Sequence, residues 1–221
     1  MDLRVLDPAP EEDFTRYKPP ESIELRGKQL SIALDDGSAV KLAFAGGDAP
    51  SHDCVKISEN VFFISYVTIE ACVSYVLDTA TGLVTRVAAG QSGKAEISFG
   101  ALADTPATSL HGFTADLAGN AAEWTLGTGD QSFFKVVYGD GGAELSRPRD
   151  SGAALAATDF KAVKIAEGIY LQNAAVTRGG EVFSVNLLSD FDRVKCVGNV
   201  FGTAADGRVF YRVIGGYGRI V

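Results

Sequence analysis

Two short segments of this 221-residue chain carry the residue types best suited to chemistry. The first, AEWTL, sets Glu123 among apolar and aromatic residues, and the second, FFKVVY, contains Lys135 and Tyr138. Because side chains alternate between the two faces of a strand, a turn at residues 127–130 would bring Glu123 and Lys135 onto one face. A carboxylate inside an apolar barrel has a raised pKa and can act as a general acid or base. The predicted catalytic residues are therefore Glu123, Lys135 and Tyr138, and a solvent-facing ion pair is the alternative.

Aromatic, amide and imidazole side chains on other segments predict a wall that binds substrate. Tyr66 ends the run VFFISY, in which Ser65 is the only other polar residue, and its hydroxyl can face a ligand; a core tyrosine with a satisfied hydroxyl or a surface tyrosine is the alternative. His111 is the side-chain type that most often exchanges protons near neutral pH, although a lone loop histidine is usually solvated. The predicted substrate-binding residues are Tyr66, Trp124, Phe133, Tyr170, Asn173 and His111.

No signature of nucleotide, nucleophile or metal chemistry is present in the sequence. The chain has no Ser in a GxSxG context, no GxGxxG and no P-loop. Its two histidines, His52 and His111, lack acidic neighbours at ligand spacing, so no metal is expected. Cys54, Cys72 and Cys196 form no CxxC pair and lie in or beside apolar runs, which predicts buried thiols. We therefore expect an activity without a cofactor.

The composition narrows the class of partner. A net charge of −8 and a pI near 4.8 argue against nucleic acid, because binding to phosphates needs clustered Lys and Arg. No apolar run approaches the roughly 18 residues that span a bilayer, and the acidic, Pro-rich start has no apolar signal region. The expected protein is cytoplasmic, bound to neither membrane nor nucleic acid, with a small molecule as its partner.

Short runs of Val, Ile, Phe and Tyr alternate with Gly, Asp and Asn from about residue 22 onward, and residues 1–21 look like an extended leader. The triplet DDG at residues 35–37 predicts a hairpin. This spacing is typical of an antiparallel sheet that curls into a sandwich or barrel. The predicted strands are residues 30–34, 39–44, 61–68, 72–77, 83–88, 95–99, 113–117, 122–126, 133–138, 162–165, 169–171, 182–188, 194–201 and 208–214.

The chain also repeats itself. VKISENVFFISYV begins at residue 55 and VKIAEGIYLQNAAV at residue 163, an offset of 108. The following segments align with Ser74 opposite Ser184, and GKQLSIALDDGSAVKLAF from Gly27 aligns with GNAAEWTLGTGDQSFFKVVY from Gly119. Order, spacing and residue character agree over three segments. We therefore predict a tandem repeat of two β-units, residues 22–112 and 113–221, which together could form one intimate domain.

These segments carry a resemblance to a known family. GKQLSIALDDGSAVKLAF, ENVFFISYV and VSYVLDTATGLVTRV resemble the N-terminal half of the MoaF family, and IYL followed by VNLLSDFDRVKCVGNVFG is similar to its C-terminal half. The likeness covers about residues 22–215. It implies a calycin fold, with lipocalin-like antiparallel barrel units whose interiors can take a small ligand. The chain departs from the family at QNAA after Leu171, where the family has an aromatic residue followed by Arg-Glu, so no site is carried over there.

Three classes of function remain open. The leading hypothesis is a cofactor-free lyase or decarboxylase that cleaves a C–C bond of a small phenolic substrate by acid/base catalysis, which would place the chain in aromatic compound metabolism. It relies on an analogy with calycin-like phenolic acid decarboxylases. The alternatives are a carrier or sensor of the lipocalin type and a protein that serves assembly. Incompletely closed units would leave edge strands able to pair between chains, so a homodimer is plausible.

Overall fold

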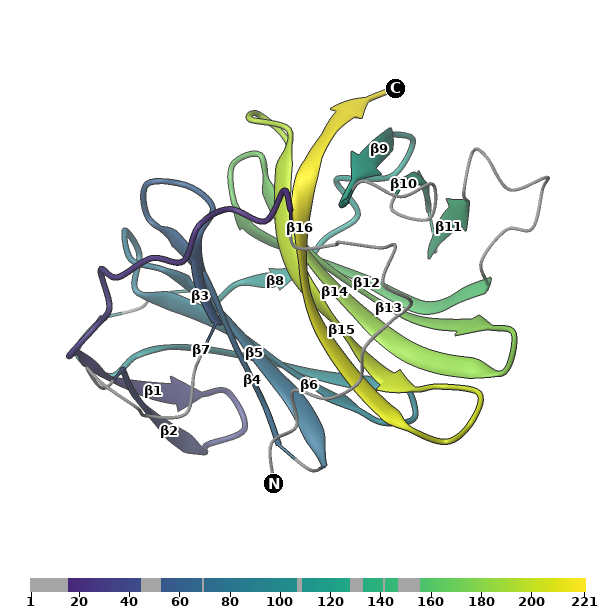
Figure 1. Ribbon diagram of the computed structural model, residues 1–221. Coiled ribbons are helices and arrows are strands. Elements are labelled where there is room, and N and C mark those ends of the chain that lie inside the picture. Colours follow the sequence, from purple (N-terminus) through teal and green to yellow (C-terminus); the bar gives the residue numbers. More distant parts are fainter. Residues whose placement is uncertain are drawn as a thin grey trace.

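The fold is all-β in a computed structural model that describes residues 16–44, 53–68, 70–106, 109–127, 133–140, 142–146 and 156–221. Each half of the chain builds one curled antiparallel sheet (Figure 1). The seven-stranded first sheet, here called the first unit, has the order β2-β1-β7-β6-β5-β4-β3. Its strands are β1 Gln29–Leu34, β2 Ala39–Ala43, β3 Asp53–Lys56, β4 Val61–Val67, β5 Ala71–Asp78, β6 Leu83–Gly90 and β7 Ala95–Leu102.

The second half of the chain forms the nine-stranded second unit, with the order β11-β10-β9-β16-β15-β14-β13-β12-β8. Its strands are β8 Gly112–Phe113, β9 Ala121–Thr125, β10 Phe133–Gly139, β11 Gly142–Ser146, β12 Ala156–Ala166, β13 Ile169–Arg178, β14 Glu181–Asp190, β15 Lys195–Thr203 and β16 Val209–Ile220. The all-β antiparallel fold expected from the sequence is thus confirmed. None of the residues with described positions forms a helix long and apolar enough to cross a membrane.

The two units pair their strands in the same order. Removing the outermost β11 and β8 from the second sheet leaves β10, β9, β16, β15, β14, β13 and β12 where the first sheet has β2, β1, β7, β6, β5, β4 and β3. Even the hairpin registers correspond, because Val61 faces Asp78 in the first unit and Ile169 faces Asp190 in the second. A duplication as the origin of this likeness stays a prediction.

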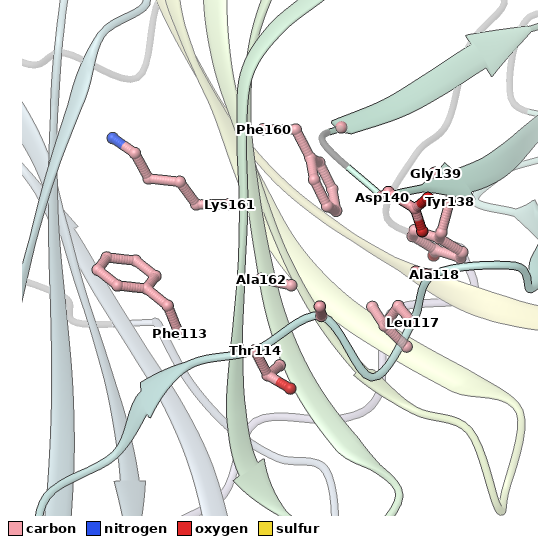
Figure 2. Close-up of a pocket in the computed structure, with 12 residues that line it drawn as sticks. Phe113, Thr114, Leu117, Ala118, Tyr138, Gly139, Asp140, Phe160, Lys161 and Ala162 are labelled. Atoms are coloured by element: carbon pink, nitrogen blue, oxygen red, sulfur yellow. The ribbon is translucent and has the colours of Figure 1, made fainter.

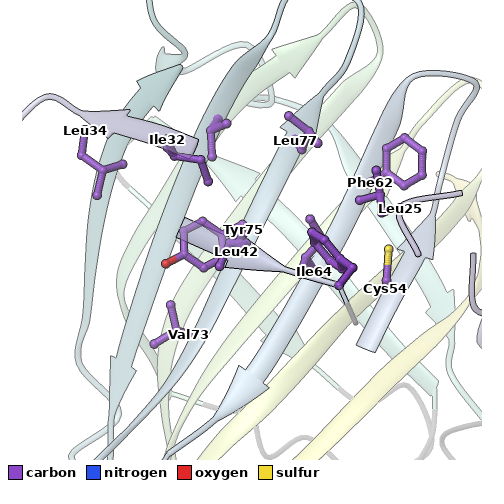
Figure 3. Packing of buried hydrophobic residues seen from close by; sticks show 12 residues of the cluster. Leu25, Ile32, Leu34, Leu42, Cys54, Phe62, Ile64, Val73, Tyr75 and Leu77 are labelled. Carbon is purple, nitrogen blue, oxygen red and sulfur yellow. The ribbon is translucent and has the colours of Figure 1, made fainter. Parts of the chain in front are cut away.

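Each sheet curls around an apolar core on what we call its inner face. In the first unit this core contains Ile32, Phe62, Ile64, Tyr75 and Leu77, among other side chains (Figure 3). In the second unit it is richer in large aromatic residues and includes Trp124, Tyr138 and Tyr170. Alternation along the strands selects these residues, since Phe62 and Ile64 of β4 point inward.

The outer faces of the two sheets pack against each other. Side chains that alternate with the inner cores, such as Phe63 of β4 and Leu171 of β13, form one shared cluster with almost no exposure. This cluster explains why VFFISYV is apolar on both faces: strand β4 lies between two cores. The members of the cluster include Val55, Val61, Phe63, Val76 and Val87 from the first unit and Val163, Ile169, Leu171, Leu188 and Val197 from the second.

A buried polar network, here called the amide seam, crosses the same interface. Asn173, Asn186 and Asn199 are direct partners on β13, β14 and β15. The Asn173 amide donates to Oδ1 of Asn186 at 2.7 Å, and the Asn186 amide donates to Oδ1 of Asn199 at 2.8 Å. Asn199 then donates to the hydroxyls of Ser65 and Ser74 in the first unit, each at 2.7 Å. Buried polar groups are tolerated when their hydrogen bonds are made, so the seam fixes how the units dock.

The N-terminal segment ties the units together. Of the predicted leader, residues 1–15 lie outside the described part, and the remainder crosses both sheets. Tyr17 packs edge-on against Tyr217 of β16 at 5.1 Å, and Glu21 forms a β-bridge with Val55 of the first unit. Gly215 is required at this crossing, because a Cβ there would lie 2.8 Å from Cα of Lys18.

Several details differ from the sequence expectation. Strand β8 ends at Phe113, because the Thr114 hydroxyl accepts the amide N–H of Asp116 and starts a turn. Strands β3 and β11 were missed, and β7, β12, β13, β14 and β16 are longer than expected. The equivalence of Ser74 and Ser184 is wrong by register: Ser74 faces Ser65, and the matching pair in the second unit is Asn186 and Asn173. The turn predicted at residues 127–130 lies largely outside the described part.

Candidate functional site

Glu123 and Lys135 lie on the outer face of the second unit. They are direct cross-strand partners on β9 and β10, as the sequence predicts. Their neighbours Trp124 and Val136 point to the inner core instead, so alternation turns Glu123 and Lys135 away from it. The Glu123 carboxylate accepts from Nε and Nη2 of Arg219, each at 2.6 Å. The structure therefore pairs Glu123 with Arg219 and places both Glu123 and Lys135 on the opposite face from Tyr138.

Tyr138 lies on the inner face, at one end of a buried hydrogen-bond chain. Its hydroxyl donates to Oε1 of Gln172 at 2.7 Å, and Nε2 of Gln172 donates to the Ser189 hydroxyl at 3.0 Å. Tyr138 is 2 % exposed, and Ser189 is fully buried. The chain of donors and acceptors crosses the interior from β10 to β13 and β14, which fixes the orientation of the Gln172 amide.

Aromatic rings pack around the Tyr138 end of this hydrogen-bond chain. Phe191 occupies the middle, with its ring centroid 5.8 Å from Trp124, 6.2 Å from Tyr138 and 5.7 Å from Tyr170, all in edge-to-face contact. Such contacts add stability beyond the burial of apolar area. Trp124 and Tyr170, both predicted to bind substrate, thus share one interior with Tyr138. This interior, with its opening, is the candidate site.

A pocket of about 220 Å³ opens beside Tyr138 (Figure 2). Its walls come from the segment after β8, the end of β10, the start of β11 and the middle of β12. Phe160 and Tyr138 form one side, with ring centroids 6.0 Å apart. The lining is mostly apolar, and Thr114 and Asp140 supply polar side chains, whereas the ammonium of the lining residue Lys161 points away from the pocket (Figure 2). A concave, mainly apolar pocket with a few polar groups is the usual form of a small-molecule site.

A β-bulge in β12 shapes the pocket wall. The pairing of β12 with β13 shifts register between Thr158 and Lys161. Asp159 at this point has φ 54, a left-handed conformation uncommon outside glycine. The Lys161 ammonium donates a hydrogen bond to Oδ2 of Asp159, with Nζ 3.2 Å from the oxygen. Bulges re-aim side chains, and this one accompanies the placement of both Phe160 and Lys161 in the pocket lining.

Charged groups also lie close to the pocket, on the segment after β8 and on β12. Nζ of Lys164 lies 3.1 Å from Asp116, and the Tyr170 hydroxyl donates to Oδ2 of Asp116 at 3.5 Å. The Thr114 hydroxyl and then Lys164 hold the pKa of Asp116 below its ordinary value, and burial raises the pKa of Tyr170. The Asp116 carboxylate is thus ionised at neutral pH and connects the segment after β8 to β12.

The other predicted substrate-binding residues lie elsewhere. Phe133 shares the outer face with Lys135, and Asn173 belongs to the amide seam. Tyr66 lies in the first unit, stacked with Tyr75 at 6.3 Å. His111 is not solvated: it is 6 % exposed, and Nδ1 lies 2.8 Å from the Thr85 hydroxyl on β6. His52 lies outside the described residues. The second-unit interior therefore unites Tyr138, Trp124 and Tyr170 from the predicted set.

Several residues of the candidate site were not predicted from the sequence. The sequence did contain a signal for Gln172: it is a polar residue in an apolar strand, and the first repeat has Ile64 at the corresponding position. Asp140 and Lys161 gave no such signal, because they lie in polar, loop-like sequence whose folding around the pocket depends on the bulge in β12.

The interior offers hydrogen bonding rather than acid/base chemistry. Burial raises the pKa of Tyr138, so its hydroxyl stays protonated at neutral pH and acts as a donor. Burial likewise raises the pKa of Cys196, which keeps this inner-face thiol unreactive. All three cysteines are buried and free, as the sequence predicts. Within the described ranges, no group of three or more His, Cys, Asp or Glu side chains is placed to hold a metal ion.

No family model matches the chain, and no curated protein does. The resemblance to the MoaF family therefore stays a prediction, and the function of the chain has to be inferred from the geometry of its two units.

Proposed function

We propose that this chain is a small-molecule-binding protein whose second unit takes a single-ring aromatic compound. The observation that carries the proposal is the pocket of about 220 Å³ between Tyr138, Phe160 and the segment after β8. Typical pockets for drug-sized ligands are larger, roughly 300–1,000 Å³, whereas dry cavities of about 150 Å³ accept benzene. The size and the aromatic lining together favour one ring.

The polar rim supports a ligand that carries a hydroxyl group. The Asp140 carboxylate lies at the opening and can accept a hydrogen bond from such a hydroxyl, whereas the Lys161 ammonium points to the other side of β12 and bonds Asp159 (Figure 2). The deeper wall is fixed by the Tyr138–Gln172–Ser189 chain, whose hydrogen bonds are already satisfied. Because breaking these hydrogen bonds would cost free energy, we expect the ligand to turn its apolar body, not its polar group, toward this wall.

The single tryptophan provides the test. Trp124 contacts Phe191, which contacts Tyr138 of the pocket wall, so a bound ring should change the tryptophan emission. We expect para-cresol to produce a saturable change in fluorescence. Replacing Ala118 in the lining with Phe fills the pocket and should abolish this change, whereas Ala80→Phe in an exposed turn of the first unit should preserve it. A response that survives Ala118→Phe would place the ligand elsewhere and contradict the proposal.

A second candidate is the lyase of the leading sequence hypothesis. One observation favours it: Asp140 carries the carboxylate in the described pocket lining, two residues after Tyr138 in the chain (Figure 2). Decarboxylation of a phenolic acid needs one group that removes the phenol proton and one that protonates the carbon that loses CO₂. Asp140 is exposed and Tyr138 is held protonated, so the geometry supports binding better than catalysis.

The two candidates separate in one assay. Incubation with para-hydroxycinnamate should leave its ultraviolet spectrum unchanged if the chain is a carrier. If the chain is a lyase, the spectrum should shift as CO₂ is released, and Asp140→Asn should stop the shift while para-cresol still binds. The expected homodimer and the cytoplasmic location stay predictions in either case.

A further inference from the structure

Three polar side chains lie side by side on the inner face of the first unit. Tyr75 on β5 is the direct partner of Arg86 on β6, and Arg86 is the direct partner of Ser98 on β7. Directly opposed residues on one face have Cβ atoms about 4.5–5.5 Å apart. Val84 and Ala88, which flank Arg86 by two positions, contact the first-unit core and confirm that Arg86 points inward.

Tyr66 on the adjacent β4 completes the group, here called the Arg86 cluster. Its ring stacks on Tyr75 at 6.3 Å. Burial, and then the neighbouring Tyr66 hydroxyl, raise the pKa of Tyr75 to about 12, while Arg86 acts in the opposite direction. The two hydroxyls and the guanidinium therefore lie close enough to influence each other. Tyr75 is 1 % exposed and Ser98 6 %, whereas Tyr66 and Arg86 are partly open to solvent.

Arg86 forms no ion pair with any carboxylate that the structure describes. Arg86 does influence Asp36 in the turn after β1, whose pKa is lowered first by hydrogen bonds from Ser38 and to a lesser degree by Arg86. Arg86 is only partly buried and interacts with the Tyr75 hydroxyl, but the side chains on its face of the sheet are mostly apolar. An anion would supply the counter-charge that the described carboxylates do not.

The fold itself does not require this group. The same pairing positions in the second unit hold Leu187, Gly198 and Ile214, which are direct partners on β14, β15 and β16. A unit with the same strand order is therefore built without any charge there. The Arg86 cluster is an addition to the scaffold, and function is the simplest reason for such an addition.

We propose that the Arg86 cluster is a second binding site, specific for an organic anion with an aromatic or apolar body. The guanidinium would hold a carboxylate or sulfonate through paired N–H groups, the hydroxyls of Tyr75 and Ser98 would donate to the same oxygens, and the ring of Tyr66 would cover the body of the ligand. This site lies in a different unit from the pocket at Tyr138 and does not depend on the proposed function of that pocket.

The test uses two dyes that differ by one charge. Anilinonaphthalene sulfonate and N-phenylnaphthylamine share their rings, and only the first carries an anionic group. We expect Arg86→Gln to weaken binding of the sulfonate about 10-fold or more and to change binding of the neutral dye less than about 2-fold, because one charge-assisted contact is lost. Arg86→Lys should recover part of the affinity, since it keeps the charge without the paired geometry.

Two further measurements serve as controls for this test. In the unaltered protein, added NaCl should weaken binding of the sulfonate and leave the neutral dye unaffected, which needs no variant to fold. Lys135→Gln on the outer face of the second unit is the matched control and should leave sulfonate affinity unchanged. Equal sulfonate affinity in Arg86→Gln and the unaltered protein would overturn the proposal, and so would an equal loss of affinity in Lys135→Gln. Neither result would affect the para-cresol assay.

Discussion

The inner faces of the two units share one pattern of strand pairing but place their polar groups in different rows. In the first unit, the row that contains Ile64 continues through Tyr75, Arg86 and Ser98. In the second unit, the equivalent row begins with Gln172 and continues through Leu187, Gly198 and Ile214. Pairing thus decides which positions face inward, whereas the residue type decides which end of the row is polar.

The contrast between Arg86 and Gly198 shows how the local backbone limits this choice. Gly198 approaches the Asn186 carbonyl of β14 so closely that a Cβ would collide with its oxygen. The second unit therefore has no room for a long side chain at this point, and its polar groups gather around Tyr138 and Gln172 instead. Two chemically different interiors on one scaffold are the result.

The outer faces differ in the same way, and the largest predicted effect concerns them. The seam positions are Ser65 and Ser74 in the first unit but Asn173, Asn186 and Asn199 in the second. Asn199→Leu should lower the free energy of unfolding by on the order of 3 kcal/mol, because the buried Asn186 amide loses its acceptor and the two serine hydroxyls lose the donor that joins the units. Chemical denaturation of the full chain measures this change.

A matched control lies at the end of the seam. Ser184 accepts one hydrogen bond from Asn173, at 2.9 Å, so Ser184→Ala should cost about 1 kcal/mol. If Asn199→Leu proves no more destabilising than Ser184→Ala, the seam does not hold the units together.

The alternation of strand residues was predictable from the sequence, and the assignment of each face to a core was not. The sequence separates Val61, Phe63 and Ser65 from Phe62 and Ile64, and the structure confirms this division. However, both faces of β4 are apolar because a second sheet covers the outer one, so composition cannot tell the inside of a unit from the interface.

The same ambiguity explains the placement of the candidate residues. The register that joins Glu123 to Lys135 was predictable, but the face that they occupy depends on how β9 and β10 curl around Trp124. Asn173 looked like a ligand contact for a similar reason, because a polar residue in an apolar strand fits a binding pocket and a buried seam equally well. The pocket at Tyr138 needed the bulge at Asp159, which has no sequence signal.

A smaller effect should come from His111, which lies in the connection between the two units. Burial lowers its pKa below the ordinary value of 6.5, against a weaker opposing influence of Asp78, and Nδ1 contacts the Thr85 hydroxyl while Nε2 has no partner within the described part of the chain. The unfolded chain therefore takes up the proton first, so this contribution to stability is complete above pH 6.5 and is lost as the pH falls.

Thermal unfolding at two pH values measures the contribution of His111. We expect the unaltered protein to lose on the order of 1 kcal/mol more stability than His111→Gln between about pH 7 and about pH 5.5. An identical pH dependence in both proteins would mean that the imidazole gains a proton without penalty, and that the junction between the units is open to water.

The smallest effect concerns Glu123, and it tests the assignment of faces directly. The Glu123 side chain is 12 % exposed but its partner Arg219 is 72 % exposed, so solvent screens the ion pair at the guanidinium. Glu123→Gln keeps a hydrogen-bond acceptor for Arg219 and should change the free energy of unfolding by about 0.5 kcal/mol or less. Because Glu123 points away from Trp124 and Tyr138, the same variant should bind para-cresol with unchanged affinity. A loss of binding in Glu123→Gln, beside full binding in the matched surface variant Lys135→Gln, would return Glu123 to the interior and reverse the distinction between the inner and outer faces of the second unit.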